Sequence, residues 1–376
     1  MSKRAPLVLL AAGGTGGHLF PAEALANVLA ARGITVDLAT DSRAAAYAGN
    51  FPARKIHVVP SDTVRGGNPI RLLWTLFVLG IGILKAIFLM LWLRPDAVVG
   101  FGGYPTFPPL IAAWLTGVPR IVHEQNAVMG RANRALASRA TAIATGYPNI
   151  FTNRPDLAAK ATHTGNPVRA AVRAAASAPY ESPQGASAIR LLVFGGSQGA
   201  RIMSEIVPGA IELCTPALRS RFQVVQQCRE EDVAEVKAVY ARLGLRAEIA
   251  TFFKDLPAKM AASQLVIARS GASTVAELAA LGRPAILVPL PHALDNDQLA
   301  NAMALAAAGG AMLIRQAEFT SERLAQELAH LLADPDTLSG MAAAARRTGN
   351  PDAAECLADL VLRVARIQQI GQNPTA

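Results

Sequence analysis

One local pattern occurs twice in the chain, and it constrains the fold more than any other feature of the sequence. An apolar run over 7–12 leads into a glycine-rich loop over 13–17, and a second apolar run over 189–194 leads into a loop over 195–199. A helical pattern follows each loop. A buried strand, a glycine loop and a helix start together open a Rossmann-like unit, in which the N–H groups of the helix start face an anion. The repeat therefore predicts an α/β fold of two Rossmann-like, parallel-sheet domains that face each other across a cleft, the default binding site.

The length of the chain agrees with two domains, because a single hydrophobic core stops growing beyond roughly 250–300 residues and this chain has 376. We expect a first domain over 1–165, a linker rich in Pro, Ala and Ser over 166–188, and a second domain over 189–350. A C-terminal helix and tail would occupy 351–376, with the helix able to return to the first domain. Short apolar runs typical of parallel strands recur in both domains, over 97–100, 120–123, 142–144, 223–226, 265–268 and 285–288.

The composition favours an anionic partner and argues against a disulfide or zinc scaffold. The formal net charge is +9, which favours a phosphorylated substrate, an anionic membrane face or nucleic acid. The three cysteines, Cys214, Cys228 and Cys356, are odd in number and lack metal-ligand spacing, which fits a reducing cytoplasm. We do not expect nucleic acid, because Trp and Tyr are too few to stack on bases and the basic residues are scattered singly, at Arg43, Arg54, Lys55, Arg65, Arg71 and Arg94.

The segment 72–93 is almost wholly apolar and is long enough to cross a bilayer. A single crossing would place the loops at Gly13 and His123 on opposite sides of the membrane, although both belong to one predicted sheet. We therefore expect a helix that packs partly on the sheet and lies partly at the membrane interface, flanked by Arg71 and Arg94 with Arg65 nearby. A plain core helix and a true span remain the alternatives.

The first glycine loop ends at His18, where a helix is expected to begin. The loop departs from the G-x-G-x-x-G fingerprint, and Thr40 and Asp41 come nearest to the acidic residue that a dinucleotide ribose needs, so NAD binding is not expected. The positive potential of a helix start favours the neutral form of His18, which can accept a proton from an attacking hydroxyl. His18 is thus a candidate general base; the alternative is a histidine that only holds a neighbouring loop.

Two further polar clusters follow apolar runs. The run His123–Asn126 leaves the carboxyl end of a predicted strand and suits sugar hydroxyls, although a hydrogen-bonded loop lock explains His123 and Glu124 equally well. In the second half, the small-residue turn after Arg269 precedes helix-start hydroxyls and Glu277. That arrangement suits phosphates at the turn and ribose hydroxyls at Glu277, and the alternative is a helix-capping carboxylate.

A metal site is indicated only weakly. The stretch 295–297 spells Asp-Asn-Asp, a D-x-D that holds a divalent metal in some glycosyltransferases. Two loop–helix anion sites can neutralise a diphosphate without a metal. We therefore expect neither a metal nor another cofactor.

Together the motifs resemble the MurG family, the transferases that move N-acetylglucosamine from UDP-N-acetylglucosamine onto lipid-linked N-acetylmuramyl-pentapeptide. The family's order is followed along nearly the whole chain, by 13–18, 100–104, 123–126, 165–169, 195–199, 269–274 with Glu277, and Gln298 with Asn301. The resemblance implies a GT-B fold with the acceptor on the first domain and the donor mostly on the second. It implies inverting transfer to the C4 hydroxyl, which converts lipid I to lipid II in peptidoglycan synthesis and so serves cell-wall biogenesis, cell shape and cell division. It also implies a peripheral enzyme at the cytoplasmic face of the bacterial inner membrane.

The same resemblance implies the site residues. His18 would be catalytic, and the donor contacts would be Thr15, Gly16, Gly17, Asn126, Arg169, Ser197, Phe253, Ala272, Ser273, Thr274, Val275, Ala276, Glu277 and Gln298. The chain departs from the family pattern at Ala12, Phe253 and Asp297.

Two rival hypotheses remain. The first is a UDP-N-acetylglucosamine epimerase of the same fold, and the second is a membrane-docked binding protein without catalysis. The apolar segment 72–93 argues against the epimerase, which needs no lipid, and intact His18, Asn126 and Glu277 argue against the inactive protein.

Overall fold

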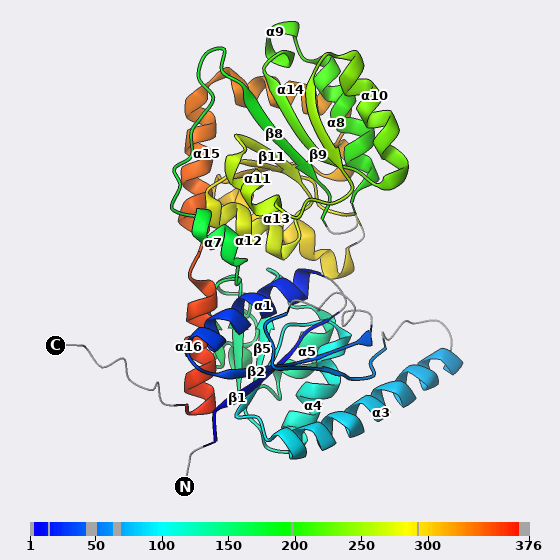
Figure 1. The fold of residues 1–376 in the computed structure, drawn as a ribbon, viewed down its shortest axis with the longest axis vertical. Helices are drawn as coiled ribbons and strands as arrows, with labels where there is room; N and C mark the ends of the chain where they lie inside the picture. The colour runs from blue at the N-terminus through cyan, green and yellow to red at the C-terminus, as the bar shows by residue number, and fades with distance from the viewer. Residues whose placement is uncertain are drawn as a thin grey trace, which may run out of the picture. The chain divides into compact units, whose positions relative to one another are not determined.

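Two parallel sheets organise the chain, one in each of two compact units (Figure 1). The computed structural model describes residues 4–13, 16–42, 51–62, 69–196, 199–291 and 293–367. Unit 1 comprises Met1–Pro167 with Asp352–Ala376, and unit 2 comprises Val168–Pro351. The predicted α/β fold with two Rossmann-like parallel sheets is confirmed.

The sheet of unit 1 has seven parallel strands in the order β3-β2-β1-β4-β5-β6-β7. The interior strand β1 has five residues, all buried, because helices cover both faces of the sheet at this position. Leu9 of β1 lies opposite Asp37 of β2 and Val98 of β4. The strands are β1 (Leu7–Ala11), β2 (Thr35–Thr40), β3 (Lys55–Val58), β4 (Ala97–Gly100), β5 (Arg120–Glu124), β6 (Ala142–Thr145) and β7 (Ala161–His163).

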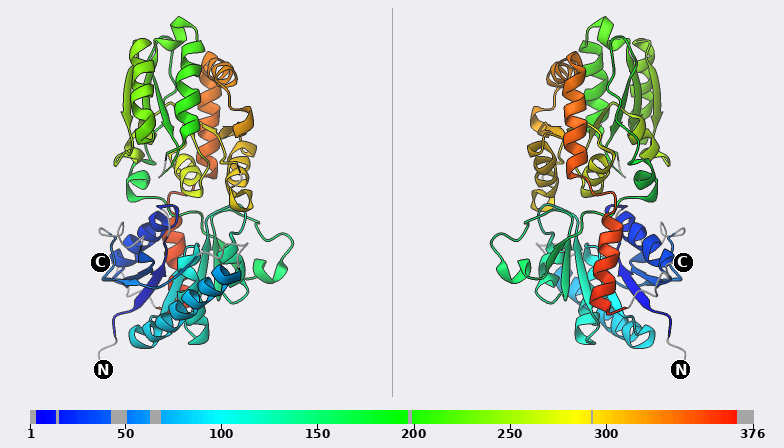
Figure 2. Two further views of the ribbon diagram at one scale, coloured as in Figure 1. Left: turned by 90° about the vertical axis from the view of Figure 1, so that its right-hand side faces the viewer. Right: turned by 90° about the vertical axis from the view of Figure 1, so that its left-hand side faces the viewer.

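Alternate side chains of β1 enter two different cores. Val8 and Leu10 pack with apolar residues of α1 (Gly16–Ala31) and α16 (Ala353–Ala365). The other face, with Leu7 and Leu9, packs against α3, α4 and α5. In Figures 1 and 2 the C-terminal helix α16, in red, lies beside α1, so the return of this helix to the first sheet is confirmed. Among the described residues, the unit also contains the helices α3 (Pro69–Leu93), η1 (Tyr104–Thr106), α4 (Phe107–Leu115), α5 (Arg131–Ala137) and α6 (Pro155–Ala158).

The sheet of unit 2 has six parallel strands in the order β10-β9-β8-β11-β12-β13. The strands are β8 (Ile189–Phe194), β9 (Phe222–Gln227), β10 (Arg246–Ala250), β11 (Leu265–Ala268), β12 (Ala285–Leu287) and β13 (Ala311–Leu313). The helices are α7 (Ala170–Ala175), α8 (Arg201–Leu213), α9 (Pro216–Arg219), η2 (Glu230–Asp232), α10 (Val233–Arg242), α11 (Leu256–Ala262), α12 (Ala272–Leu281), η3 (Leu294–Asn296), α13 (Asp297–Ala307), η4 (Gln316–Glu318), α14 (Ser321–Ala333) and α15 (Pro335–Thr348).

The stretch 166–188, expected to be a linker, contributes to unit 2. It contains α7, and Val168 and Val172 lie in a core of that unit with Leu192 of β8. Val172 lies in α7, and Val168 precedes this helix, one residue before its N-cap Arg169. The Ala- and Pro-rich composition of the stretch concealed these two apolar positions.

Helix α3 has 25 residues and connects two strands of the same sheet, β3 and β4. One side is buried, and Gly82 allows close contact there, because a Cβ at this position would lie 2.1 Å from the carbonyl oxygen of Pro60. The helix is long and apolar enough to cross a membrane. A single crossing would separate β3 from β4 within one sheet, so the arrangement of unit 1 favours a helix that stays on the side of the sheet.

The buried histidine at the end of β5 gives a prediction about pH. His123 is completely buried, and burial lowers its pKa to about 4, while a contact of Nε2 with the carbonyl oxygen of Gly165 at 3.2 Å raises it in part. Between roughly pH 6.5 and 4, the unfolded chain binds a proton at this residue that the folded chain refuses. Stability is therefore lost as the pH falls through this range.

Replacement of His123 by Asn should remove this loss. We expect the variant to be less stable than the unmodified protein at pH 7, and the difference in free energy of unfolding to shrink as the pH is lowered to 4.5. Urea unfolding at several pH values measures it. A difference that stays constant with pH would contradict the prediction.

Candidate functional site

His18 lies in the first turn of α1, with its ring over the turn that follows β4. Gly102 and Gly103 of that turn have φ values of 86° and 74°, in the left-handed region that favours glycine. A Cβ at Gly102 or at Gly103 would lie 3.3 Å from ring atoms of His18. The two glycines thus let the imidazole lie close against the backbone.

Gln125 links the His18 ring to the sheet. Its Oε1 lies 3.1 Å from Nδ1 of His18, and its Nε2 donates to the carbonyl oxygen of Phe101 at 2.8 Å. Its own carbonyl oxygen accepts from Nδ2 of Asn166 at 2.7 Å. Gln125 stands in the polar run after β5, but it could not be selected from the sequence, because the run alone does not tell which side chain faces His18.

Glu124 locks the loop that carries these groups. Its buried carboxylate accepts from the backbone N–H of Asn126 and of Gly130, both at 2.9 Å, and from Nδ2 of Asn133 at 2.8 Å. Nδ2 of Asn126 also donates to it, at 3.2 Å. The hydrogen-bonded lock is therefore the role that the structure gives to Glu124, and Asn126 is held in place by it. Asn133 was not predicted from the sequence.

The first glycine loop is only partly described. Gly13 lies against Pro105, to which a Cβ would come within 2.8 Å, so this position needs a glycine. Gly16 and Gly17 are the first residues of α1. Thr15, a predicted donor contact, lies outside the described residues.

In unit 2, α12 presents its N-terminus directly after β11. The predicted donor residues Ala272, Ser273, Thr274, Val275 and Ala276 are the first five residues of this helix. N–H groups at the start of a helix have no partner within the helix and carry positive potential, which makes them a site for phosphate oxygens. The glycine loop after β8 is equally tight, since a Cβ at Gly195 would lie 2.2 Å from the backbone nitrogen of Ala200. Ser197 of this loop lies outside the described residues.

Arg169 and Glu277 form a bidentate ion pair within unit 2. Nε and Nη2 of Arg169 donate to the two carboxylate oxygens of Glu277, each at 2.6 Å, and Glu277 is only 3% exposed. The pairing fixes the plane of the carboxylate. Each carboxylate oxygen has a further lone pair, so Glu277 keeps acceptor capacity toward ligand hydroxyls while it holds the guanidinium.

Hydrogen bonds from Arg269 and Ser270, in the turn before α12, connect this turn to the segment that follows β12. Arg269 donates from Nη1 to the carbonyl oxygens of Val288 and Pro289, both at 3.0 Å. Ser270 donates to the carbonyl oxygen of Gln298 at 2.8 Å, and Oε1 of Gln298 accepts from the N–H of Leu290 at 3.0 Å. These contacts position the Gln298 side chain beside the turn that precedes α12.

Two other predicted features lie in the same unit. Asp295 and Asn296 have φ values of 59° and 55°, and α13 begins directly after them. No group of three or more His, Cys, Asp or Glu side chains suited to a metal ion occurs among the described residues. Phe253 is buried with Nζ of Lys259 5.1 Å from its ring centre, whereas its neighbour Phe252 is 60% exposed.

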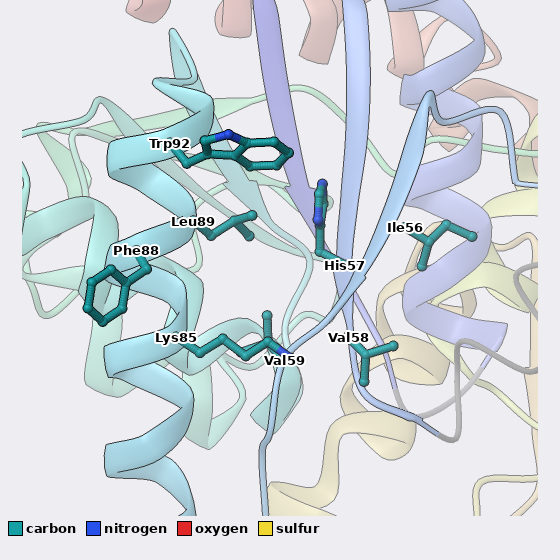
Figure 3. Close-up of a pocket in the computed structure, with 8 residues that line it drawn as sticks. All are labelled: Ile56, His57, Val58, Val59, Lys85, Phe88, Leu89 and Trp92. Carbon is teal, nitrogen blue, oxygen red and sulfur yellow. The ribbon is translucent and has the colours of Figure 1, made fainter.

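A separate pocket of about 450 Å³ lies in unit 1 between α3 and the edge strand β3 (Figure 3). Lys85, Leu89 and Trp92 point from α3 toward His57 and Val59, and Phe88 points away from them. His57 contacts Asp37 at 2.8 Å, and Arg54 and His57 hold the pKa of that carboxyl below its usual range against the opposing effect of burial. The pocket combines apolar walls with the ammonium group of Lys85.

Comparison with known proteins identifies the family. The glycosyltransferase family 28 N-terminal domain matches residues 8–145, and the family 28 C-terminal domain matches residues 190–357. A UDP-N-acetylglucosamine–N-acetylmuramyl-(pentapeptide) pyrophosphoryl-undecaprenol N-acetylglucosamine transferase of Rhodopseudomonas palustris (strain HaA2) is 61% identical over 363 residues, which are 96% of this chain and 99% of the relative.

A solved structure supports the same family assignment. The crystal structure of Acinetobacter baumannii MurG is 30% identical and superposes with a TM-score of 0.77, covering 95% of this chain and 99% of that one. The UDP-N-acetylglucosamine 2-epimerase from Neisseria meningitidis shares the fold alone, at 15% identity, a TM-score of 0.66 and coverage of 95% and 100%. The matches to both family 28 domains and to near full-length relatives place this chain in the MurG family of glycosyltransferases.

Proposed function

We propose that this protein transfers N-acetylglucosamine from UDP-N-acetylglucosamine to the C4 hydroxyl of lipid-linked N-acetylmuramyl-pentapeptide. The observation that carries the proposal is the position of His18, which is held at the start of α1 by Gln125 and by the glycines at 102 and 103. A neutral imidazole fixed at a helix start is suited to accept a proton from a sugar hydroxyl. The 61% identity to a transferase with this substrate in its name supports the same reaction.

The reaction needs one proton transfer and a stabilised leaving group. The C4 oxygen attacks the anomeric carbon of the donor, its proton passes to His18, and the bond from the anomeric carbon to the diphosphate oxygen breaks with inversion. The departing UDP takes the electron pair. The helix-start N–H groups of α12, the loop with Ser197 and the guanidinium of Arg169 would stabilise the negative charge on its diphosphate. Glu277 would accept hydrogen bonds from the ribose hydroxyls.

An assay of labelled N-acetylglucosamine transfer to the lipid-linked acceptor tests this function. We expect disaccharide lipid from the unmodified enzyme with EDTA present, since helix-start N–H groups can neutralise the diphosphate. His18→Ala should lower kcat by about 10²- to 10⁴-fold, the range of a general base, with donor binding retained in calorimetry. His163→Ala, an exposed histidine of the same unit, is the matched control. An unchanged kcat for His18→Ala would remove His18 from the base role.

A UDP-N-acetylglucosamine epimerase is the second candidate, because solved epimerases have this fold. An epimerase would convert the donor without any lipid acceptor. The transfer assay run without acceptor separates the two: epimerised sugar nucleotide would favour the epimerase, and unchanged donor would favour the transferase.

The ion pair of Arg169 and Glu277 predicts a specific effect on the donor. Glu277→Gln keeps the size of the side chain but removes the charge that orients the guanidinium. We expect the donor KM to rise by roughly tenfold, the effect of about 1.4 kcal/mol of lost binding, with kcat changed much less. Glu248→Gln, an exposed glutamate paired with Lys259, serves as control. A donor KM equal to that of the control would contradict the role of Glu277.

The same proposal places the enzyme on the cytoplasmic face of the inner membrane as a peripheral protein. The outer side of α3 carries exposed large apolar side chains, and Arg71, Lys85 and Arg94 lie on or next to the helix. An apolar surface bordered by basic residues binds to anionic bilayers by both burial and charge. The exposed apolar residues of α3 are Ile70, Leu72, Leu73, Trp74, Leu76, Phe77, Ile81, Leu84, Phe88, Leu91 and Trp92.

Charges on this side of α3 should prevent docking. Phe77→Glu combined with Leu84→Glu should reduce binding to anionic vesicles by more than tenfold, because both side chains are more than half exposed and each would otherwise bury apolar area worth about 1.5–3 kcal/mol. Sedimentation with vesicles measures binding. Leu213→Glu, at an exposed leucine of unit 2, is the control. Equal vesicle binding by both variants would exclude α3 as the docking surface.

A further inference from the structure

We propose that Gln125 is a positioning residue that keeps the proton of His18 on Nδ1, so that Nε2 is the nitrogen that takes the proton of the acceptor hydroxyl. The proposal rests on the proposed function, in which His18 is the general base. Gln125 takes no part in bond making or bond breaking in this reaction, and the proposal gives it the role of orienting His18. The proposal also assigns separate roles to the two nitrogens of the imidazole.

The orientation of the Gln125 amide follows from its partner on the sheet. The carbonyl oxygen of Phe101 lies 2.8 Å from one end of the amide and can only accept a hydrogen bond. That end must therefore be the NH₂ group, since an oxygen there would place two acceptors against each other. Gln125 is 2% exposed, so water does not compete for the contact.

With the amide oriented in this way, its oxygen faces Nδ1 of His18 at 3.1 Å. An amide oxygen has no proton to donate, so the hydrogen bond forms only when Nδ1 carries the hydrogen. A neutral imidazole has a single N–H. Nε2 therefore keeps its lone pair and is the acceptor nitrogen.

Backbone groups keep Gln125 and its partner Phe101 in place. The carbonyl oxygen of Gln125 accepts from Asn166, and the N–H of Phe101 donates to the carbonyl oxygen of Ala11 on β1. Gly103 lies beside Nε2 of His18, where a Cβ would come within 3.4 Å. The glycine thus leaves space on the side of the ring where the acceptor nitrogen lies.

A neutral amide differs from the carboxylate that orients the histidine in serine hydrolases. The carboxylate also stabilises the imidazolium, whereas Gln125 orients the ring without adding a charge next to it. Gln125 therefore sets the tautomer of the ring and not its charge, and the ¹⁵N signals of the ring separate this orienting role from a merely structural one.

The first test is ¹⁵N NMR of the full-length protein labelled at histidine, with His18→Asn used to assign the signal. The two tautomers of neutral imidazole have distinct ¹⁵N shifts, and we expect His18 to show the Nδ1–H form. Gln125→Met removes the amide oxygen and should shift the population toward the Nε2–H form. It should also lower kcat by about 10²-fold, the loss expected when a general base is misaligned, with both KM values changed less than threefold.

Gln226→Met is the matched control, because Gln226 is also buried and bridges a backbone carbonyl and a side chain. Its Nε2 donates to the carbonyl oxygen of Met203, and its Oε1 accepts from the hydroxyl of Tyr240. Both variants should lose stability, and only Gln125→Met should change the tautomer and kcat. A comparable loss of kcat in the control would assign the effect to stability and overturn the proposal.

Two other results would also overturn it: an Nε2–H tautomer in the unmodified protein, or a Gln125→Met enzyme with the Nδ1–H form and full kcat. The tautomer is measured without turnover, so it stands apart from the proposed function. Suppose that the unmodified protein shows the Nδ1–H form and that His18→Ala transfers at full rate. The base role of His18 would then be refuted, whereas the placement of the proton by Gln125 would remain supported.

Discussion

The backbone hydrogen bonds of two parallel sheets, whose interior strands are covered by helices, are the constraint on which the rest of this structure depends. A central strand such as β1 or β8 has both faces buried, so its N–H and C=O groups are paired with neighbouring strands. Parallel pairing then directs every strand of a sheet the same way. The loops that follow β1, β4 and β5 consequently meet at one edge, where His18, Gly102 and Gln125 come together although they are distant in the chain.

Each unit holds a polar loop rigid through a buried glutamate, and the partners of that glutamate differ in charge. In unit 1 the buried Glu124 accepts four hydrogen bonds and makes the loop after β5 rigid, and the groups directed at His18 are neutral. In unit 2 the rigid element is an ion pair, in which Arg169 holds both oxygens of Glu277. In the proposed reaction, a neutral surrounding suits a histidine that gains a proton. A fixed guanidinium there suits a leaving group that gains negative charge.

Much of the fold could be predicted from local sequence patterns, because a buried parallel strand is a short apolar run and a glycine loop is recognisable by composition. The two sheets, the helix over 72–93 and the return of the C-terminal helix followed from such patterns. The packing of Val168 and Val172 into a core of unit 2 did not, since two apolar positions among alanines give a weak signal. Gln125 and Asn133 were also missed, because their roles depend on partners contributed by other loops.

The sequence by itself determined the number of sheets, the positions of the glycine loops and the family of the chain, because these properties depend on runs of neighbouring residues and on the order of motifs. Only the tertiary structure decided which polar side chains meet. Arg169 and Glu277 are 108 residues apart, and His18 and Gln125 are 107 apart. A hydrogen bond depends on distance and direction between two atoms, and these are set by the packing of whole strands and helices. The sequence pattern of one segment does not determine that packing.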